Sequence, residues 1–293
     1  MTDMMSRIAG APITWGVDGS PGWGHLMDAD RVLGEMAEIG LKATELGPDG
    51  YLPVDPGELK AKLDGYGLAM VGGFVPAVLH LPERAEADLA YAARAAHTLA
   101  GCDAEVIVLG PGSGFDGYDR SIDMTEGEWT VFLSNLEKVI ASAAAEGLTV
   151  SLHQHWGMAI ETQAHVERLI ADSNVSFCLD TGHLFLGGAD PVEIAEKAAG
   201  RVSHVHLKDA DGEMAKQVRS GELAFRQSVI DGIFKPLGGG DIDIAGFVKT
   251  LEGQGFDGWY VLEQDCVLDE DPAPGEGPIA DARTSYEYLA ALQ

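Results

Sequence analysis

The 293-residue chain is predicted to be an α/β protein, a single (β/α)8 TIM barrel over residues 1–293. Helical patterns repeatedly end at a glycine that is followed by an apolar run, as at Gly40, Gly67, Gly147 and Gly255. The apolar runs are nearly continuous, which is typical of strands buried on both faces of a parallel sheet. Eight such strand–helix units fit the length of the chain.

Eight strands are expected, at residues 7–14, 42–46, 68–74, 104–110, 148–153, 175–180, 202–207 and 258–263. Each precedes a helical stretch, and the last helix covers the final fifteen or so residues. Asp28 is placed to cap a helix with Met36 and Ile39 on its apolar side. Thr125 and Glu128 have the spacing of a capping box at the start of another helix.

A doubly wound sheet is the alternative fold. The glycine-rich residues 110–114 lack the G-x-G-x-x-G spacing of a dinucleotide loop, and no acidic residue ends a following strand. This segment is therefore interpreted as an active-site loop. Two stretches rich in Pro, Gly and acidic residues, 210–243 and 265–277, are interpreted as loops between strand and helix, and the acidic residues 265–276 as solvated surface.

Composition limits the partners and the compartment. The chain has 19 Lys and Arg against 47 Asp and Glu, a net charge of −28, which disfavours nucleic acid and anionic membranes. No apolar stretch is long enough for a membrane span, and no signal peptide is evident. Cys102, Cys178 and Cys266 are far apart, so we expect no disulfide framework and a reducing cytoplasm.

Ionisable side chains concentrate where predicted strands end, namely Glu45, then His153 and His155, then Asp180 and His183, then His204, His206, Lys208 and Asp209, and finally Glu263 and Asp265. The carboxyl ends of barrel strands meet at one face, which is where such enzymes place their active sites. Imidazole together with carboxylate suits Mn²⁺, Fe²⁺, Co²⁺ or Zn²⁺ better than Ca²⁺. A divalent metal site is favoured over a set of unrelated buried histidines.

Strand periodicity leaves several roles open. Alternation places His204 and His206 on the same face, and it likewise does not separate His153 from His155. His183 follows Asp180 by three residues, past a Thr-Gly turn, and could bind metal, orient Asp180 or reach substrate.

Seven segments resemble the xylose-isomerase-like sugar phosphate isomerase/epimerase superfamily. They are Ile-Thr-Trp near the start, Thr-Glu-Leu-Gly at 44–47, His-Gln-His-Trp-Gly at 153–157, Leu-Asp-Thr-Gly-His at 179–183, His-Val-His-Leu-Lys-Asp at 204–209, Pro-Leu-Gly-Gly-Gly-Asp-Ile-Asp at 236–243 and Gly-Trp-Tyr-Val-Leu-Glu-Gln-Asp at 258–265. The resemblance spans nearly the whole chain. Within the superfamily the chain is most similar to the inosose dehydratases, lyases of inositol catabolism.

The resemblance implies four metal ligands: His153, Asp180, His206 and Glu263. Many relatives, including ketose 3-epimerases, have Glu at the first position, whereas inosose dehydratases have His. Epimerases of this kind use two opposed metal-bound carboxylates as acid/base groups, and only Glu263 is retained here. Gln154 and Trp156 stand where the dehydratases usually have a longer run of His and then Met-Gly, so a substrate other than inosose stays open.

The function implied is that of a metal-dependent carbon–oxygen lyase, a dehydratase that acts on a keto-inositol or keto-sugar through an enediolate. The alternatives are a sugar isomerase or epimerase, a lyase that β-eliminates from a 3-keto-glycoside, and a non-enzymatic sugar-binding barrel, which the complete ligand set disfavours. The partner is a polyhydroxylated ketone, and a homo-oligomer stays open. Mn²⁺ or Co²⁺ is expected, with Zn²⁺, Mg²⁺ or Fe²⁺ as further candidates, because closed structural zinc sites are richer in thiolate.

Roles follow from the same comparison. Catalysis is assigned to Glu263, His183, Lys208 and Glu45, and substrate binding to His155, Glu161, Asp209, Trp15 and Trp156. His206 is expected to be the ligand and His204 a supporting residue, because His206 is nearer the end of its strand by roughly 6–7 Å. His204 is then expected to hydrogen-bond a ligand from beneath.

Overall fold

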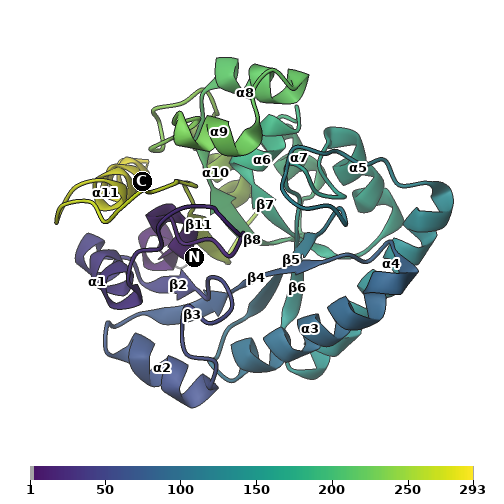
Figure 1. Ribbon diagram of the computed structural model, residues 1–293, viewed down its shortest axis with the longest axis horizontal. Coiled ribbons are helices and arrows are strands. Elements are labelled where there is room, and N and C mark those ends of the chain that lie inside the picture. The colour runs from purple at the N-terminus through teal and green to yellow at the C-terminus, as the bar shows by residue number, and fades with distance from the viewer. Residues whose placement is uncertain (1–2, 293) are drawn as a thin grey trace.

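The computed structural model describes residues 3–292 and has a sheet of nine parallel strands at its centre, surrounded by helices (Figure 1). Its spatial order is β3, β2, β1, β11, β8, β7, β6, β5, β4. In chain order these strands are β1 (Ile8–Gly10), β2 (Ala43–Glu45), β3 (Ala69–Gly72), β4 (Phe74–Ala77), β5 (Val106–Pro111), β6 (Thr149–His153), β7 (Ser176–Asp180), β8 (Val202–Leu207) and β11 (Trp259–Leu262).

The two edges of this sheet are joined through one residue. β3 pairs with β2 and β4 pairs with β5, yet only Gly73 separates β3 from β4. The carbonyl of Gly72 accepts from the amide of Leu46, and that of Gly73 accepts from the amide of Val108, both at 3.0 Å. The strand expected at 68–74 therefore changes partners at Gly73 and closes the barrel, which confirms the predicted fold class.

The helices are α1 (Ala29–Ile39), α2 (Pro56–Asp64), α3 (Pro82–Ala100), α4 (Glu126–Ala145), α5 (Gln163–Asp172), α6 (Thr181–Leu186), α7 (Pro191–Lys197), α8 (Gly212–Ser220), α9 (Phe225–Ile230), α10 (Ile244–Gly253) and α11 (Pro278–Ala290). Both predicted caps are confirmed. Asp28 accepts from the amides of Asp30 and Arg31, and Thr125 forms the reciprocal capping box with Glu128.

Two expectations need correction. The strand expected at 7–14 has only three residues, and a 3-10 helix, Pro12–Trp15, follows it. Pro12 has no N–H to donate to a strand ladder, and it occupies the first turn of that helix, where none is needed. Residues 210–243, expected as loop, contain α8, α9 and a short antiparallel pair formed by β9 (Asp209–Ala210) and β10 (Phe234–Lys235).

Alternation along the strands separates the core from the barrel interior. Ile107 and Leu109 of β5 belong to the large apolar cluster that includes Phe132 of α4. Val106 and Val108, on the other face of β5, pack with Cys178 of β7. Along β7, Phe177 and Leu179 likewise lie in the large cluster, so Cys178 and Asp180 face the interior.

Within residues 3–292, no helix combines the length and the apolar character that a membrane crossing requires. The three cysteines are free thiols.

Closure at Gly73 generates a stability prediction. A Cβ on this buried residue would lie 2.9 Å from Leu46 Cβ and 3.4 Å from Leu99 Cδ2. We expect Gly73→Ala to lower the free energy of unfolding by about 1–3 kcal/mol through overpacking. Gly34→Ala is the control, because its Cβ would have no neighbour nearer than 3.8 Å and alanine favours helix α1 by about 0.5–1 kcal/mol. Urea denaturation measures both, and equal effects would contradict the closure argument.

Candidate metal centre and active site

Four polar side chains meet at the carboxyl ends of β6, β7, β8 and β11. His153, Asp180, His206 and Glu263 each offer one atom, and these atoms all lie within 4.8 Å of one another. The strand register brings them together, since Asp180 is directly opposite His206. All four side chains are buried. The structure thus gathers the residues that the resemblance implies as metal ligands.

The donor atoms in this group point at one another. His206 Nδ1 lies 2.8 Å from Glu263 Oε2, and His153 Nε2 lies 3.5 Å from Asp180 Oδ2. His153 Nε2, His206 Nδ1 and Asp180 Oδ2 are buried and have no hydrogen-bond partner among the described residues. Buried polar atoms without partners are costly and uncommon. A divalent cation among these two imidazoles and two carboxylates would satisfy them, so the residues fit the implied metal.

Glu45, at the end of β2, decides which nitrogen of His206 is free. Its Oε1 accepts from Nε2 of His204 and from Nε2 of His206, both at 2.9 Å. Because a carboxylate only accepts, Nε2 of His206 donates to Glu45, and Nδ1 is the nitrogen that faces Glu263 and Asp180. His204 was expected to hydrogen-bond a ligand directly. Instead it bonds Glu45, which in turn holds the ligand.

Lys208 lies fully buried behind the group of four. Its Nζ is 2.9 Å from Glu263 Oε1, 2.8 Å from Asp265 Oδ1 and 3.4 Å from Asp180 Oδ2. Burial alone would lower the pKa of Lys208, but these three carboxylates outweigh it and raise the pKa well above its ordinary value. The ammonium therefore stays charged. Gly182 makes room for it, since a Cβ there would lie 2.7 Å from Lys208 Cγ.

Asp265 was wrongly assigned to the solvated acidic loop. Its side chain is buried, lines the cavity described below and pairs with Lys208. Burial raises the pKa of Asp265 to about 7, although Lys208 acts in the opposite direction. Burial also acts to raise the pKa of Glu263, but His206 and Lys208 outweigh it and hold that pKa at about 2. The signal for Asp265 was its spacing, two residues beyond Glu263 at the end of the last strand.

His155 has a defined tautomer. Its Nδ1 lies 2.6 Å from the carbonyl oxygen of Trp156, which only accepts, so Nδ1 donates and Nε2 is an acceptor. The ring lies against two others, with centroid distances of 3.6 Å to His183 and 4.6 Å to Tyr118 and interplanar angles of 32° and 36°. Burial, together with the neighbouring His153, lowers the pKa of His155 to about 3. This imidazole is neutral, and no sequence signal pointed to Tyr118.

His183 contacts Asp180 and Lys208. Its backbone amide donates to Asp180 Oδ1 at 2.8 Å, and its Nε2 lies 3.1 Å from Lys208 Nζ. Burial lowers the pKa of His183 well below its ordinary value. The ring is fully buried and does not line the cavity.

A cavity of about 920 Å³ opens over these strand ends. Its polar lining includes Glu45, His153, His155, His206, Glu263 and Asp265. The remaining lining carries several aromatic rings, among them Trp23, Phe74, Tyr91, Phe115, Tyr118 and Phe225. Polar groups beside aromatic walls suit a polyhydroxylated ring, which has polar edges and apolar faces.

Four residues predicted to bind substrate do not line this cavity. Trp15 is fully buried and donates from Nε1 to Glu35, and Trp156 is also buried. Asp209 accepts from the amides of Gly238, Gly240 and Ile242, so it holds the segment at 236–243 in place. Glu161 accepts from the Ser121 hydroxyl at 3.1 Å. In the structure these side chains make packing and loop-holding contacts, and their assignment to substrate stays a prediction.

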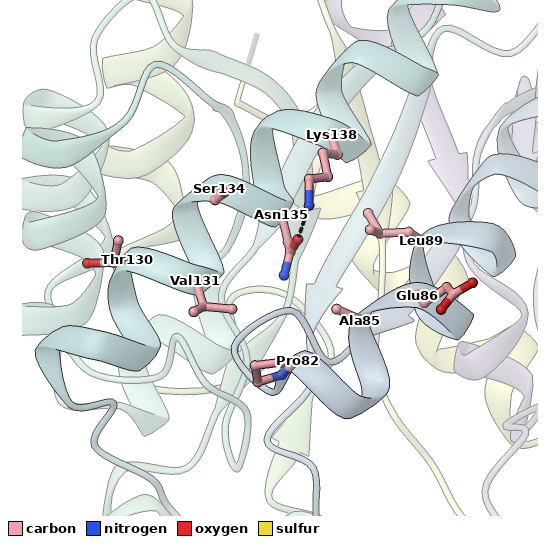
Figure 2. Close-up of a pocket in the computed structure, with 9 residues that line it drawn as sticks. All are labelled: Pro82, Ala85, Glu86, Leu89, Thr130, Val131, Ser134, Asn135 and Lys138. Carbon is pink, nitrogen blue, oxygen red and sulfur yellow. Dashed lines mark hydrogen bonds between the residues drawn. The ribbon is translucent and has the colours of Figure 1, made fainter.

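A second hollow, of about 660 Å³, lies between α3 and α4 on the outside of the barrel (Figure 2). Within it Lys138 donates to Asn135, whose amide donates to the carbonyl of Leu79. None of the metal-ligand candidates lines this hollow, so the chemistry is sought at the strand ends.

The chain is similar in sequence and in fold to known proteins. The chain is 33% identical to the inosose dehydratase of Geobacillus kaustophilus over 98% of this chain and 94% of that protein. Its fold is similar to that of the probable 3-DHS dehydratase AsbF of Bacillus anthracis (TM-score 0.71, 14% identity, 97% of this chain and 98% of that one). It is also similar to that of the IOLI protein with a bound zinc atom (TM-score 0.70, 13% identity, 98% and 97%).

A family model described as xylose isomerase-like TIM barrel matches residues 33–291. This match covers most of the barrel and all four candidate ligands, and with the closed parallel sheet it shows that the chain belongs to the xylose isomerase-like TIM barrel family.

Proposed function

We propose that this chain is a metal-dependent dehydratase that removes water from an inosose or a closely related keto-cyclitol. The nearly full-length similarity to an inosose dehydratase supports the substrate class. Two observations carry the reaction class. The ligand group contains His153, an imidazole, and the cavity lining contains His155, whose Nε2 is an acceptor. Elimination of water needs one base and one acid, whereas epimerisation needs a base on each face of the substrate.

His153, Asp180, His206 and Glu263 would hold the metal, and we favour Mn²⁺ or Co²⁺ over Zn²⁺, Mg²⁺ or Fe²⁺. When bound, a divalent cation draws charge from the ketone oxygen and so acidifies the neighbouring C–H. Glu45 would orient His206 for this role, and Lys208 would hold Glu263 and Asp180 through its ammonium.

His155 would take the proton from carbon, and because its pKa is low, about 3, this transfer would depend on a bound metal that lowers the pKa of the C–H. Its Nδ1 is held by the Trp156 carbonyl, so the lone pair is on Nε2, and stacking between His183 and Tyr118 fixes the plane of the ring. Asp265 lines the cavity 2.8 Å from Lys208 Nζ. This pair would return a proton to the hydroxyl that leaves, so that the C–H proton goes to His155 and the hydroxyl departs as water.

A second candidate is β-elimination from a 3-keto-glycoside. The cavity, at about 920 Å³, is near the upper end of the size range for drug-sized ligands, and a six-carbon ring alone fills only part of it. The aromatic residues of the lining could stack on a leaving sugar or aglycone. For either reaction we propose a cytoplasmic enzyme, which is in keeping with three free cysteines.

The function is tested by supplying Mn²⁺-loaded protein with 2-keto-myo-inositol. We expect the ultraviolet absorbance of an enolised dione to rise and one molecule of water to be lost per molecule of product, as mass spectrometry would show. A 3-keto-glycoside is tested in parallel for release of its leaving group. Conversion of a ketose to its epimer, with no dione formed, would overturn the dehydratase proposal.

The proposed base generates a second prediction. His155→Gln should lower kcat by about 10²–10⁴-fold, the usual contribution of general base catalysis, while the metal content stays that of the parent. His97→Gln is the control, since His97 is exposed near the end of α3. Steady-state kinetics and elemental analysis measure the two effects. A kcat within about threefold of the parent would exclude His155 as the base, because general base catalysis contributes far more.

The ligand assignment generates a third prediction. His206→Ala should weaken metal binding by more than about 100-fold, which exceeds the usual cost of losing an outer partner of a ligand. His183→Ala should keep the metal, because the backbone amide that holds Asp180 remains. It should nevertheless lose turnover, because His155 loses the ring on which it stacks. Elemental analysis after dialysis decides the matter, and release of metal from both variants alike would refute the distinction.

A further inference from the structure

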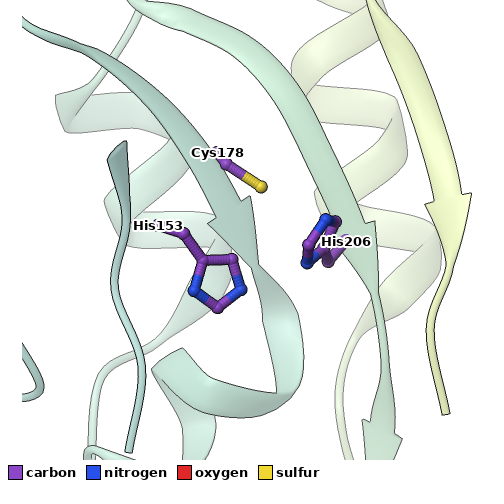
Figure 3. A group of neighbouring side chains, drawn as sticks. All are labelled: His153, Cys178 and His206. Atoms are coloured by element: carbon purple, nitrogen blue, oxygen red, sulfur yellow. The ribbon is translucent and has the colours of Figure 1, made fainter. Parts of the chain in front are cut away.

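The thiol of Cys178 lies beside two of the proposed metal ligands. Cys178 is on β7, two residues before Asp180, so both side chains face the barrel interior. Its Sγ, one nitrogen of His153 and one of His206 all lie within 4.8 Å of one another (Figure 3). All three side chains are buried.

The imidazole nitrogens in the group of His153, Cys178 and His206 have lone pairs or protons that no described residue satisfies. Both ring nitrogens of His153 and Nδ1 of His206 are buried without a hydrogen-bond partner among residues 3–292. In the strand register Cys178 stands opposite His153 on one side and His204 on the other. Two residues along a strand span roughly 6–7 Å, so the thiol lies deeper in the barrel than the Asp180 carboxylate.

We propose that the barrel holds an inner cation position formed by His153, Cys178 and His206, which selects thiophilic divalent ions such as Zn²⁺ and Cd²⁺. A thiolate with two imidazoles is a soft donor set, whereas Asp180 and Glu263 offer the hard oxygen atoms that Mn²⁺ prefers. Binding deprotonates the thiol, and its proton is released to solvent. The two positions share both imidazoles, so an ion in one excludes an ion from the other.

The position of the ion has a consequence for activity. Glu263 lines the cavity, whereas Cys178 does not. An ion held by Cys178 would lie farther from the substrate and would leave the outer carboxylates without a cation. Zn²⁺ and Cd²⁺ are therefore competitive with the activating metal. The loss of activity rests on the proposed function, but the binding of the ion does not.

The test is cadmium spectroscopy and cadmium affinity. Parent protein loaded with Cd²⁺ should show an ultraviolet sulfur-to-cadmium charge-transfer band, and Cys178→Ser should not. The same variant should bind Cd²⁺ at least about tenfold more weakly, a loss seen even for partners of ligands, and should bind Mn²⁺ like the parent. Glu263→Gln should show the opposite pattern, with Mn²⁺ binding weakened and the band retained.

Matched controls use the other two cysteines. Cys102, which donates to the carbonyl of Pro56, and Cys266, which donates to that of Thr14, are replaced together by serine. This double variant leaves Cys178 as the sole thiol and should keep the full band. It decides the outcome even if Cys178→Ser fails to fold. A cadmium-loaded double variant without the band, or unchanged Cd²⁺ affinity in folded Cys178→Ser, overturns the inner position. A band without dehydration of 2-keto-myo-inositol would instead count against the proposed function alone.

Discussion

An excess of buried negative charge governs the mouth of this barrel. Four carboxylates, those of Glu45, Asp180, Glu263 and Asp265, are buried at this end of the barrel, and the ammonium of Lys208 contacts the last three. An uncompensated buried charge costs several kcal/mol even after relaxation. One lysine cannot neutralise four carboxylates, so further positive charge is needed at this end of the barrel. A divalent cation among the donor atoms would supply it, which would tie the stability of the barrel mouth to the metal.

The same demand explains the ionisation of His206. Burial would lower the pKa of His206, but Cys178, Glu263 and Glu45 outweigh burial and raise it well above the ordinary value. A proton on His206 offsets part of the buried negative charge, and a metal ion at Nδ1 would offset the same charge. Because Glu45 accepts from Nε2, a metal held by His206 would take the place of the proton on Nδ1. Glu45 orients the ring in both states.

The fold and the position of the site could be predicted because both follow from short-range patterns. Nearly continuous apolar runs and glycine-terminated helices indicate parallel strands, and parallel strands place His153, Asp180 and His206 at one edge. Which nitrogen faces the metal could not be predicted, because it depends on Glu45, a partner more than 150 residues away. The contact of Trp15 could not be predicted either, because its indole donates to Glu35, a side chain on a different element.

The histidine at position 153 connects the charge balance with the chemistry. A carboxylate there would place a fifth buried negative charge beside Asp180, only 3.5 Å away, with Lys208 still the nearest ammonium. An imidazole ligates a metal equally well and adds no charge. It also removes the second carboxylate base that a two-face epimerisation requires, so under the proposed function proton transfer would fall to one face, where His155 lies. Neutrality at this one position therefore lowers the buried negative charge of the barrel mouth and is in keeping with the proposed elimination.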